Sequence, residues 1–119
     1  MFINISNHAS SGWSEQQLKK AKEYGEVIDI PFPEVNPRAD SDEINRQVEE
    51  LYGQVMKYQD PVVMVQGEFV LTFRLVTKLL AADLRVVAAC SERNTVEEID
   101  EEGNTVKKIR FEFVGFKEY

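Results

Sequence analysis

The chain has 119 residues, of which 43% are hydrophobic and 29% are charged. These proportions are typical of a folded globular protein and exclude general disorder. The formal net charge of −7 argues against a protein that binds long nucleic acid through a broad basic face. A short or cyclic oligonucleotide is not excluded, because backbone amides and a few side chains are enough to hold one.

The first residues alternate between apolar and polar, which predicts a strand at residues 2–6 and not a signal sequence. No apolar run reaches the roughly 18 residues needed to cross a membrane. The single cysteine, Cys90, excludes a disulfide framework and, with only one histidine in the chain, a Cys/His zinc site. Its apolar neighbours predict a buried thiol in a reducing compartment. We therefore expect a cytoplasmic protein without a membrane anchor, a metal or a cofactor.

A polar loop at residues 7–12 precedes the first helix, which we expect at about residues 15–24. Ser14 is placed to cap this helix, because Gln17 follows three residues later in the capping-box pattern. The apolar residues between positions 27 and 32 predict a second strand. Prolines end it, since proline cannot donate a hydrogen bond to a central ladder.

Apolar residues then recur at steps of three and four from position 44 to position 58, which predicts an amphipathic helix with one buried stripe. Residues 62–65 are a continuous apolar run, typical of a strand that is covered on both faces. After a break at residues 66–68, a third helix is expected at about residues 69–82. This helix is apolar nearly all round and therefore needs burial on two sides, either by a second subunit or between the sheet and a C-terminal hairpin.

A further apolar run predicts a fourth strand at residues 85–90, followed by a polar loop at residues 91–94. Residues 95–99 and 106–114 flank a turn-forming segment at residues 100–104, which predicts a β-hairpin. This hairpin either extends the sheet or reaches across to a partner. Its second strand has apolar residues at alternate positions, namely Ile109, Phe111 and Phe113.

The alternation of buried strands with helices predicts an α/β fold with a parallel sheet and helices on both faces. We expect a compact Rossmann-like domain of three layers, with a four-stranded, mainly parallel sheet and the C-terminal hairpin. Residues 1–119 form this single domain, and the hairpin at residues 95–119 belongs to it.

In an open parallel sheet, ligands bind beyond the carboxyl ends of the strands, near the point where the strand order reverses. The loop after the first strand carries His8, whose imidazole is suited to exchange a proton near neutral pH. The alternative is that His8 only hydrogen-bonds the backbone. A glycine turn follows the third strand, and Arg93 follows the fourth as the favoured phosphate partner. A helix-capping role for Glu68 and a solvated position for Arg93 are the structural alternatives.

His8 is thus the candidate catalytic residue. The candidate ligand-binding residues share a position at or just after a predicted strand end; they are Asn7, Ser10, Ser11, Gln66, Gly67, Glu68, Thr72, Ser91 and Arg93. No cluster of side chains has the spacing of metal ligands.

Three segments together resemble small CRISPR-associated proteins of type III systems. They are "INISNHASSGWSEQQLKKAKEYGEVIDIPFP", "VVMVQGEFVLTFRLVTKLL" and "VVAACSERNTVEE", which span nearly the whole chain. Proteins of that kind have a fold similar to the CRISPR-associated Rossmann fold (CARF) domain. Several of them act as ring nucleases or bind cyclic oligoadenylate, in antiviral defence.

The resemblance implies a homodimer that binds a cyclic oligoadenylate at its two-fold axis, above the strand ends. The first-strand loop and the glycine turn match the ligand-binding loops of that arrangement. It also implies metal-independent cleavage, in which a ribose 2′-OH attacks the adjacent phosphate and leaves a cyclic phosphate end. This sequence has Gly67-Glu68 where the larger family has a Gly-Thr/Ser-Lys turn, which puts phosphate binding by this loop, and catalysis, in question.

The function expected from these observations is binding and cleavage of a cyclic oligoadenylate messenger, which switches off type III CRISPR signalling. Two alternatives remain open. One is a non-catalytic sensor or sponge for the same messenger, and the other is an interaction subunit without a ligand.

Overall fold

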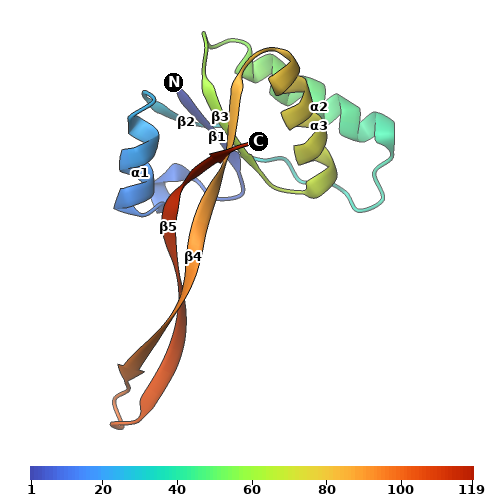
Figure 1. The fold of residues 1–119 in the computed structure, drawn as a ribbon. Helices are drawn as coiled ribbons and strands as arrows, with labels where there is room; N and C mark the ends of the chain where they lie inside the picture. Colours follow the sequence, from blue (N-terminus) through green and yellow to red (C-terminus); the bar gives the residue numbers. More distant parts are fainter.

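The structure is a computed structural model that describes residues 1–119. Strands and helices alternate as far as the fourth strand, and two long strands complete the chain (Figure 1). The elements are β1 (Phe2–Ser6), a short 3-10 helix η1 (Ser10–Gly12), α1 (Glu15–Lys22), β2 (Val27–Asp29), α2 (Ser41–Val55), β3 (Val62–Gln66), α3 (Phe69–Ala81), β4 (Arg85–Ile99) and β5 (Thr105–Glu118).

The strands form one sheet in the order β2-β1-β3-β4-β5. The first four strands are parallel, and β5 runs antiparallel to β4. The predicted α/β fold with a mainly parallel sheet and a C-terminal hairpin is confirmed. The sheet has a fifth strand because the end of β5 pairs with β4 along the sheet edge, from Val87–Glu118 to Cys90–Gly115.

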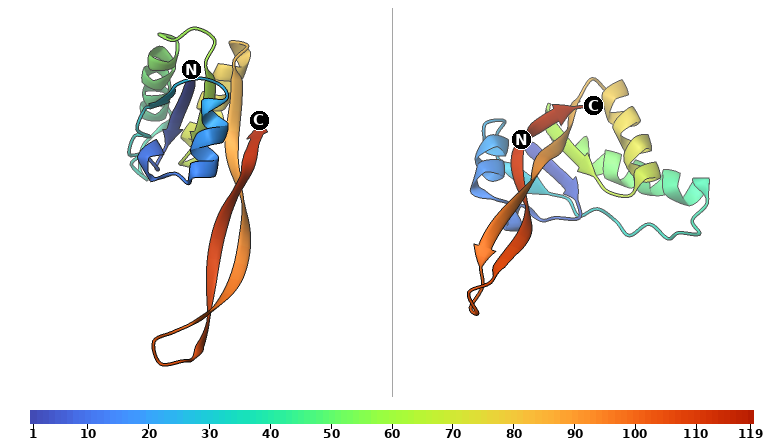
Figure 2. Two further views of the ribbon diagram at one scale, coloured as in Figure 1. Left: turned by 90° about the vertical axis from the view of Figure 1, so that its left-hand side faces the viewer. Right: turned by 60° about the horizontal axis from the view of Figure 1, so that its bottom comes forward.

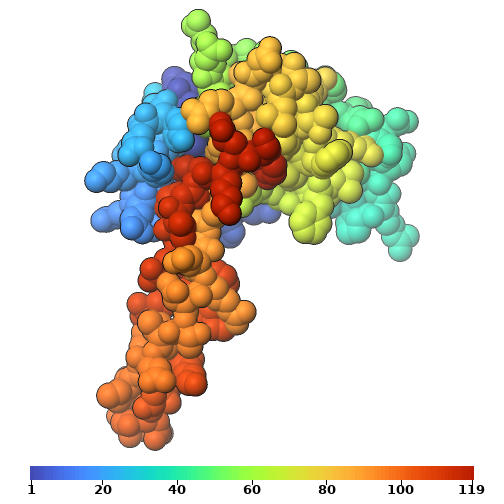
Figure 3. All heavy atoms as spheres, viewed as in Figure 1, coloured from blue at the N-terminus to red at the C-terminus, as the bar shows by residue number.

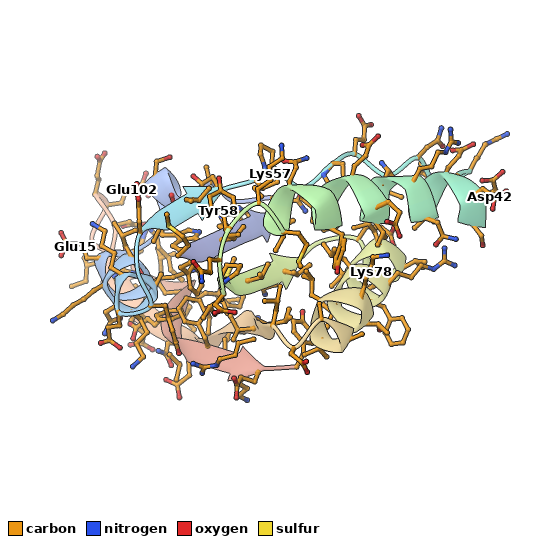
Figure 4. All side chains as sticks on the ribbon, turned by 90° about the horizontal axis from the view of Figure 1, so that it is seen from above. Glu15, Asp42, Lys57, Tyr58, Lys78 and Glu102 are labelled. Atoms are coloured by element: carbon orange, nitrogen blue, oxygen red, sulfur yellow. The ribbon has the colours of Figure 1, made fainter.

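Helices cover both faces of the sheet and make three layers (Figure 2). On one face, Ile3, Ile5 and the alternate residues of β3 pack against α2 and α3. On the other face, Phe2 packs against Ala21 of α1 and against Phe116 at the end of β5. The period-two alternation of each strand thus divides its side chains between two apolar clusters. In the view from above, α2 and α3 lie next to each other, with Lys78 at their junction (Figure 4).

Local sequence signals place the helix starts. The Ser14 hydroxyl accepts a 3.2 Å hydrogen bond from the amide of Gln17, as the capping box predicts. The Asp40 carboxylate accepts a 2.9 Å bond from the amide of Glu43 and begins α2. The buried stripe of α2 is the predicted one, although Tyr58 lies beyond the end of the helix.

The predicted end of the fourth strand at Cys90 is wrong. β4 continues to Ile99, because β5 supplies a hydrogen-bonding partner long after the pairing with β3 has ended at Val87. Ser91 and Arg93 therefore lie on a strand and not in a loop. The segment looked like a loop because both of its faces are exposed, so it carries no apolar pattern. Cys90 was expected in the core, but it is only half-buried.

The hairpin does not cover α3, so the alternative that wedged this helix between sheet and hairpin is also wrong. Leu71, Leu75, Val76 and Leu79 are buried against the sheet and α2, whereas the opposite side of α3 stays exposed. Figure 3 shows the outer part of the hairpin standing clear of the rest of the molecule. No helix in the structure combines the length and the apolar character needed to cross a bilayer.

Candidate functional site

A pocket of about 870 Å³ opens at the carboxyl end of the sheet, on the face that carries α1. Here the strand order reverses, because the chain goes from β1 outward to β2 and then returns to β3 on the other side of β1. A ligand site is expected at such a switch point in an open parallel sheet. The volume lies within the range of small-molecule sites.

Three parts of the chain form the pocket. The floor comes from the ends of β1 and β3, one wall comes from the loop after β1 and the first turn of α1, and the other wall comes from the start of the hairpin. The lining residues that the argument below uses are His8, Trp13, Gln66, Phe111, Glu112 and Phe113.

The loop after β1 is fixed by hydrogen bonds to its backbone. The carbonyl of His8 accepts a 2.8 Å bond from the Asn4 amide and a 3.3 Å bond from the Trp13 indole, and the Ser6 hydroxyl lies 3.1 Å from it. Asn4 and Ser6 are buried, so their two contacts with this carbonyl are partly shielded from water, whereas the Trp13 bond is exposed. The backbone of His8 is therefore held in place, while its side chain is exposed at the rim of the pocket.

Asp29, at the end of β2, holds the next part of this loop. Its carboxylate accepts bonds of 3.2 Å from the amide and 2.9 Å from the hydroxyl of Ser10. It also accepts a 2.9 Å bond from Asn4. Ser10 thus binds a side chain of the neighbouring strand and does not line the pocket.

Gln66 lines the pocket and also joins two strands. Its side-chain oxygen accepts a 2.8 Å bond from the amide of Ala89, and its side-chain nitrogen donates a 3.3 Å bond to the carbonyl of the same residue. These bonds continue the link between β3 and β4 beyond the last backbone pair, Met64–Val87. Gln66 therefore fixes the root of the hairpin.

Gly67 is required by a neighbouring aromatic ring. A Cβ atom at this position would lie 2.4 Å from ring atoms of Phe32, which crosses from the segment after β2. The backbone of the turn is thus approached closely by a side chain of the same chain. Gly67 nevertheless contributes to the pocket lining.

Glu68 and Thr72 lie outside the pocket, at the start of α3. One carboxylate oxygen of Glu68 caps the helix by accepting from the amide of Val70. Its other oxygen and the Thr72 hydroxyl are buried without a hydrogen-bond partner. Arg93 also lies outside the pocket, on the exposed part of β4 opposite Phe111.

The structure thus brings Asn7, His8, Ser11, Gln66, Gly67 and Ser91 together around one pocket. Glu112 is the only acidic residue among those that line it. The pocket offers amides, hydroxyls and aromatic rings but no lysine or arginine. No group of three or more His, Cys, Asp or Glu side chains is arranged to hold a metal ion.

Sequence reasoning missed the aromatic walls, which are Trp13 on one side and Phe111 and Phe113 on the other. Because Trp13 directly precedes the helix cap Ser14, its position beside the loop could have been predicted from the sequence. The alternation of Phe111 and Phe113 predicted an apolar face. Nothing in the pattern showed that this face turns toward the strand ends, because that depends on which strand β5 pairs with.

Comparison with known proteins gives one match. The model of the family described as "Uncharacterized protein MJ1673 family" matches residues 1–117. The chain belongs to the MJ1673 family. No curated protein and no solved structure matches it. The match to the MJ1673 family thus covers nearly the whole chain, but it assigns no activity.

Proposed function

We propose that this protein binds a cyclic oligoadenylate in the pocket at the strand ends and cleaves it, as the resemblance to small type III CRISPR-associated proteins implies. The observation that carries the proposal is the position of His8 at the rim of the pocket, on a loop whose backbone is fixed by hydrogen bonds from Asn4 and Trp13. A fixed backbone limits the positions that the His8 side chain can take, and such positioning of a catalytic group accelerates a reaction.

The chemistry of the walls suits a nucleotide. Bases of single-stranded nucleic acid stack on aromatic side chains, and Trp13, Phe111 and Phe113 present such rings on two sides of the pocket. Amide side chains such as Gln17 offer donors and acceptors for base edges. The first turn of α1 lines the pocket as well, and a helix N-terminus favours a phosphate.

In the proposed reaction, the side chain of His8 accepts the proton of a ribose 2′-OH while that oxygen attacks the adjacent phosphorus. The bond from phosphorus to the 5′ oxygen breaks, and the leaving oxygen takes up a proton. The products have a 2′,3′-cyclic phosphate and a 5′-OH, so no water, oxidant or metal enters the balance. Trapping of the 2′-OH in line with the phosphate supplies much of the acceleration.

A non-catalytic sensor or sponge for the same ligand is the second candidate. It is favoured by the absence of lysine and arginine from the pocket lining, because charge that develops on the phosphate has no cationic partner there. Both candidates predict binding, and only the first predicts turnover.

The only tryptophan of the chain lines the pocket, so its fluorescence reports directly on occupancy. We would titrate the protein with cyclic tri-, tetra- and hexa-adenylate, with linear oligoadenylate and with AMP, and separate the products by chromatography with and without EDTA. A saturable Trp13 signal with a cyclic ligand supports the site, and new products in the presence of EDTA support cleavage. The absence of any signal with all ligands would overturn the proposal, and binding without products would select the sponge.

A further inference from the structure

The outer hairpin, residues 91–113, is here called the arm. It leaves the domain as a twisted two-stranded ribbon (Figures 1 and 2). Phe111 and Phe113 belong to the arm and also line the pocket. The first part of the arm is thus a wall of the pocket, and the rest of the arm continues from that wall into solvent.

A β-bulge decides which side chains of the arm lie on the pocket side. In β5, Val114 has no partner, and the first pair beyond it is Ser91–Phe113. The extra residue places Phe113 on the same face as Phe116, and their ring centroids lie 5.0 Å apart. A shift of one residue moves every following side chain of a strand to the other face. Without the bulge, Phe113 and Phe111 would point away from the pocket.

Arg93 lies on this same face of the arm, directly beyond the pocket. It is the cross-strand partner of Phe111, and residues opposite each other in a sheet share a face, with Cβ atoms about 5 Å apart. The next residue on this face of β4 is Thr95, and the first acid is Glu97, which stands opposite a lysine. No acid therefore adjoins Arg93 along this face of β4.

The guanidinium of Arg93 is free to bind a ligand. Arg93 is exposed and forms no ion pair or cation–π contact within the chain. On the opposite face of the arm, Glu98 pairs with Lys108, at 2.9 Å, and with Arg110, so those cations are neutralised within the hairpin. A guanidinium binds a phosphate through two parallel N–H groups. Arg93 thus supplies the cation that the pocket lining lacks.

We propose that the ligand surface continues from the pocket onto the arm and takes an oligonucleotide of at least two nucleotides. One nucleotide occupies the pocket between Trp13 and Phe113. The neighbouring nucleotide lies on Phe111, and its phosphate binds Arg93. This inference rests on the proposed function, because it extends the same site.

The arrangement on the arm favours an oligonucleotide over a mononucleotide. Proteins that bind single-stranded nucleic acid combine aromatic side chains, on which successive bases stack, with cations that bind the backbone. Phe111 is 72% exposed, so most of its ring is available for stacking. A mononucleotide held in the pocket leaves Arg93 unused, since Arg93 lies outside the lining. The site should therefore select its ligand by length.

The test compares Arg93→Ala with Arg110→Ala, which removes an arginine from the opposite face of the arm. Trp13 fluorescence is titrated with AMP and with linear and cyclic tetra-adenylate. The wild type should bind a tetra-adenylate at least about tenfold more tightly than AMP. Arg93→Ala should lose about 10- to 100-fold in affinity for the tetra-adenylates and keep its affinity for AMP. Arg110→Ala should keep both affinities, and circular dichroism checks that each variant is folded.

The salt dependence of binding identifies a phosphate contact. Loss of one such contact should reduce the slope of log affinity against log salt concentration by about 0.7 in Arg93→Ala. Arg93→Lys should restore this slope but only part of the affinity, because lysine cannot bind a phosphate through a planar fork.

The outcomes separate this inference from the proposed function. If the wild type binds the tetra-adenylates and Arg93→Ala binds them equally well, or if Arg93→Ala loses as much affinity for AMP, the extension onto the arm is overturned and the pocket stands. If none of these ligands changes the fluorescence of the wild type, the proposed function is overturned and the extension with it.

Discussion

The phenol of Tyr119 donates a 2.7 Å hydrogen bond to the backbone carbonyl of Val65, so the last residue of the chain is tied to the central strand β3. The amide of Tyr119 also donates to the carbonyl of Val86, at 3.0 Å. The end of β5 is thus attached to two strands of the sheet, and this attachment holds the base of the hairpin in place.

Tyr119→Phe should lower the free energy of unfolding by about 0.5–1.5 kcal/mol, since it removes one hydrogen bond and little else. Urea denaturation measures the change. Tyr52→Phe is the control, because the Tyr52 hydroxyl makes no hydrogen bond within the chain, and that variant should be unchanged. Equal stability of the two variants would show that the Tyr119 bond contributes nothing.

The same side chain predicts a loss of stability in alkaline solution. Burial, and next the nearby Cys90, raise the pKa of Tyr119 above its ordinary value of 10.0. The folded chain therefore keeps the phenol proton at a pH where the unfolded chain has lost it. The contribution is complete below pH 10.0 and decreases as the pH rises through the folded pKa. The stability difference between wild type and Tyr119→Phe should shrink over this range.

Gln66→Leu should lower the free energy of unfolding by about 1–3 kcal/mol, because it leaves the amide and the carbonyl of Ala89 without their side-chain partner. Gln54→Leu changes an exposed glutamine without side-chain hydrogen bonds and is the matched control. If Gln66→Leu kept its stability and lost only ligand affinity, Gln66 would be a ligand contact and not a link between strands.

Gly67→Ala should destabilise the chain by about 1–3 kcal/mol through overpacking against the ring of Phe32. The combination with Phe32→Ala should be less destabilising than the sum of the two single changes, since removal of the ring removes the clash. Thermal or urea unfolding of the four chains completes this cycle. Additive effects would place the cost of Gly67→Ala elsewhere than at the ring.

His8→Ala should slow cleavage of a cyclic oligoadenylate by about 10²-fold or more, with nearly unchanged affinity, if His8 carries the proton. Asn4, Trp13 and Ser6 hold the backbone of His8 and not its imidazole, so the loop should survive the substitution. His8→Gln keeps a polar side chain and is the control for lost contacts. A rate and an affinity that fall together would assign His8 to binding, and a fully active His8→Ala would leave positioning of the 2′-OH as the mechanism.

Much of this protein follows from local sequence alone. The capping groups Ser14 and Asp40 place the starts of α1 and α2, and the apolar runs place β3 and the first half of β4, because these signals act within a few residues of one another. The alternation of strands and helices then determines a mainly parallel sheet, since a crossover helix permits little else. The loop that carries His8 is at a strand end for the same reason.

The tertiary structure decided the rest. β4 continues through Ser91 and Arg93 because β5 pairs with it from a distance in sequence, and no local signal reports a partner strand. That pairing moves Arg93 away from the pocket and brings Phe111 and Phe113 to its wall. Likewise, Phe69 and Phe73 are exposed and Leu71 and Leu75 are buried although all four are apolar, because α2 and the sheet cover only one side of α3. The amino-acid sequence defines the chemistry of each residue, but only long-range packing decides which surface that residue faces.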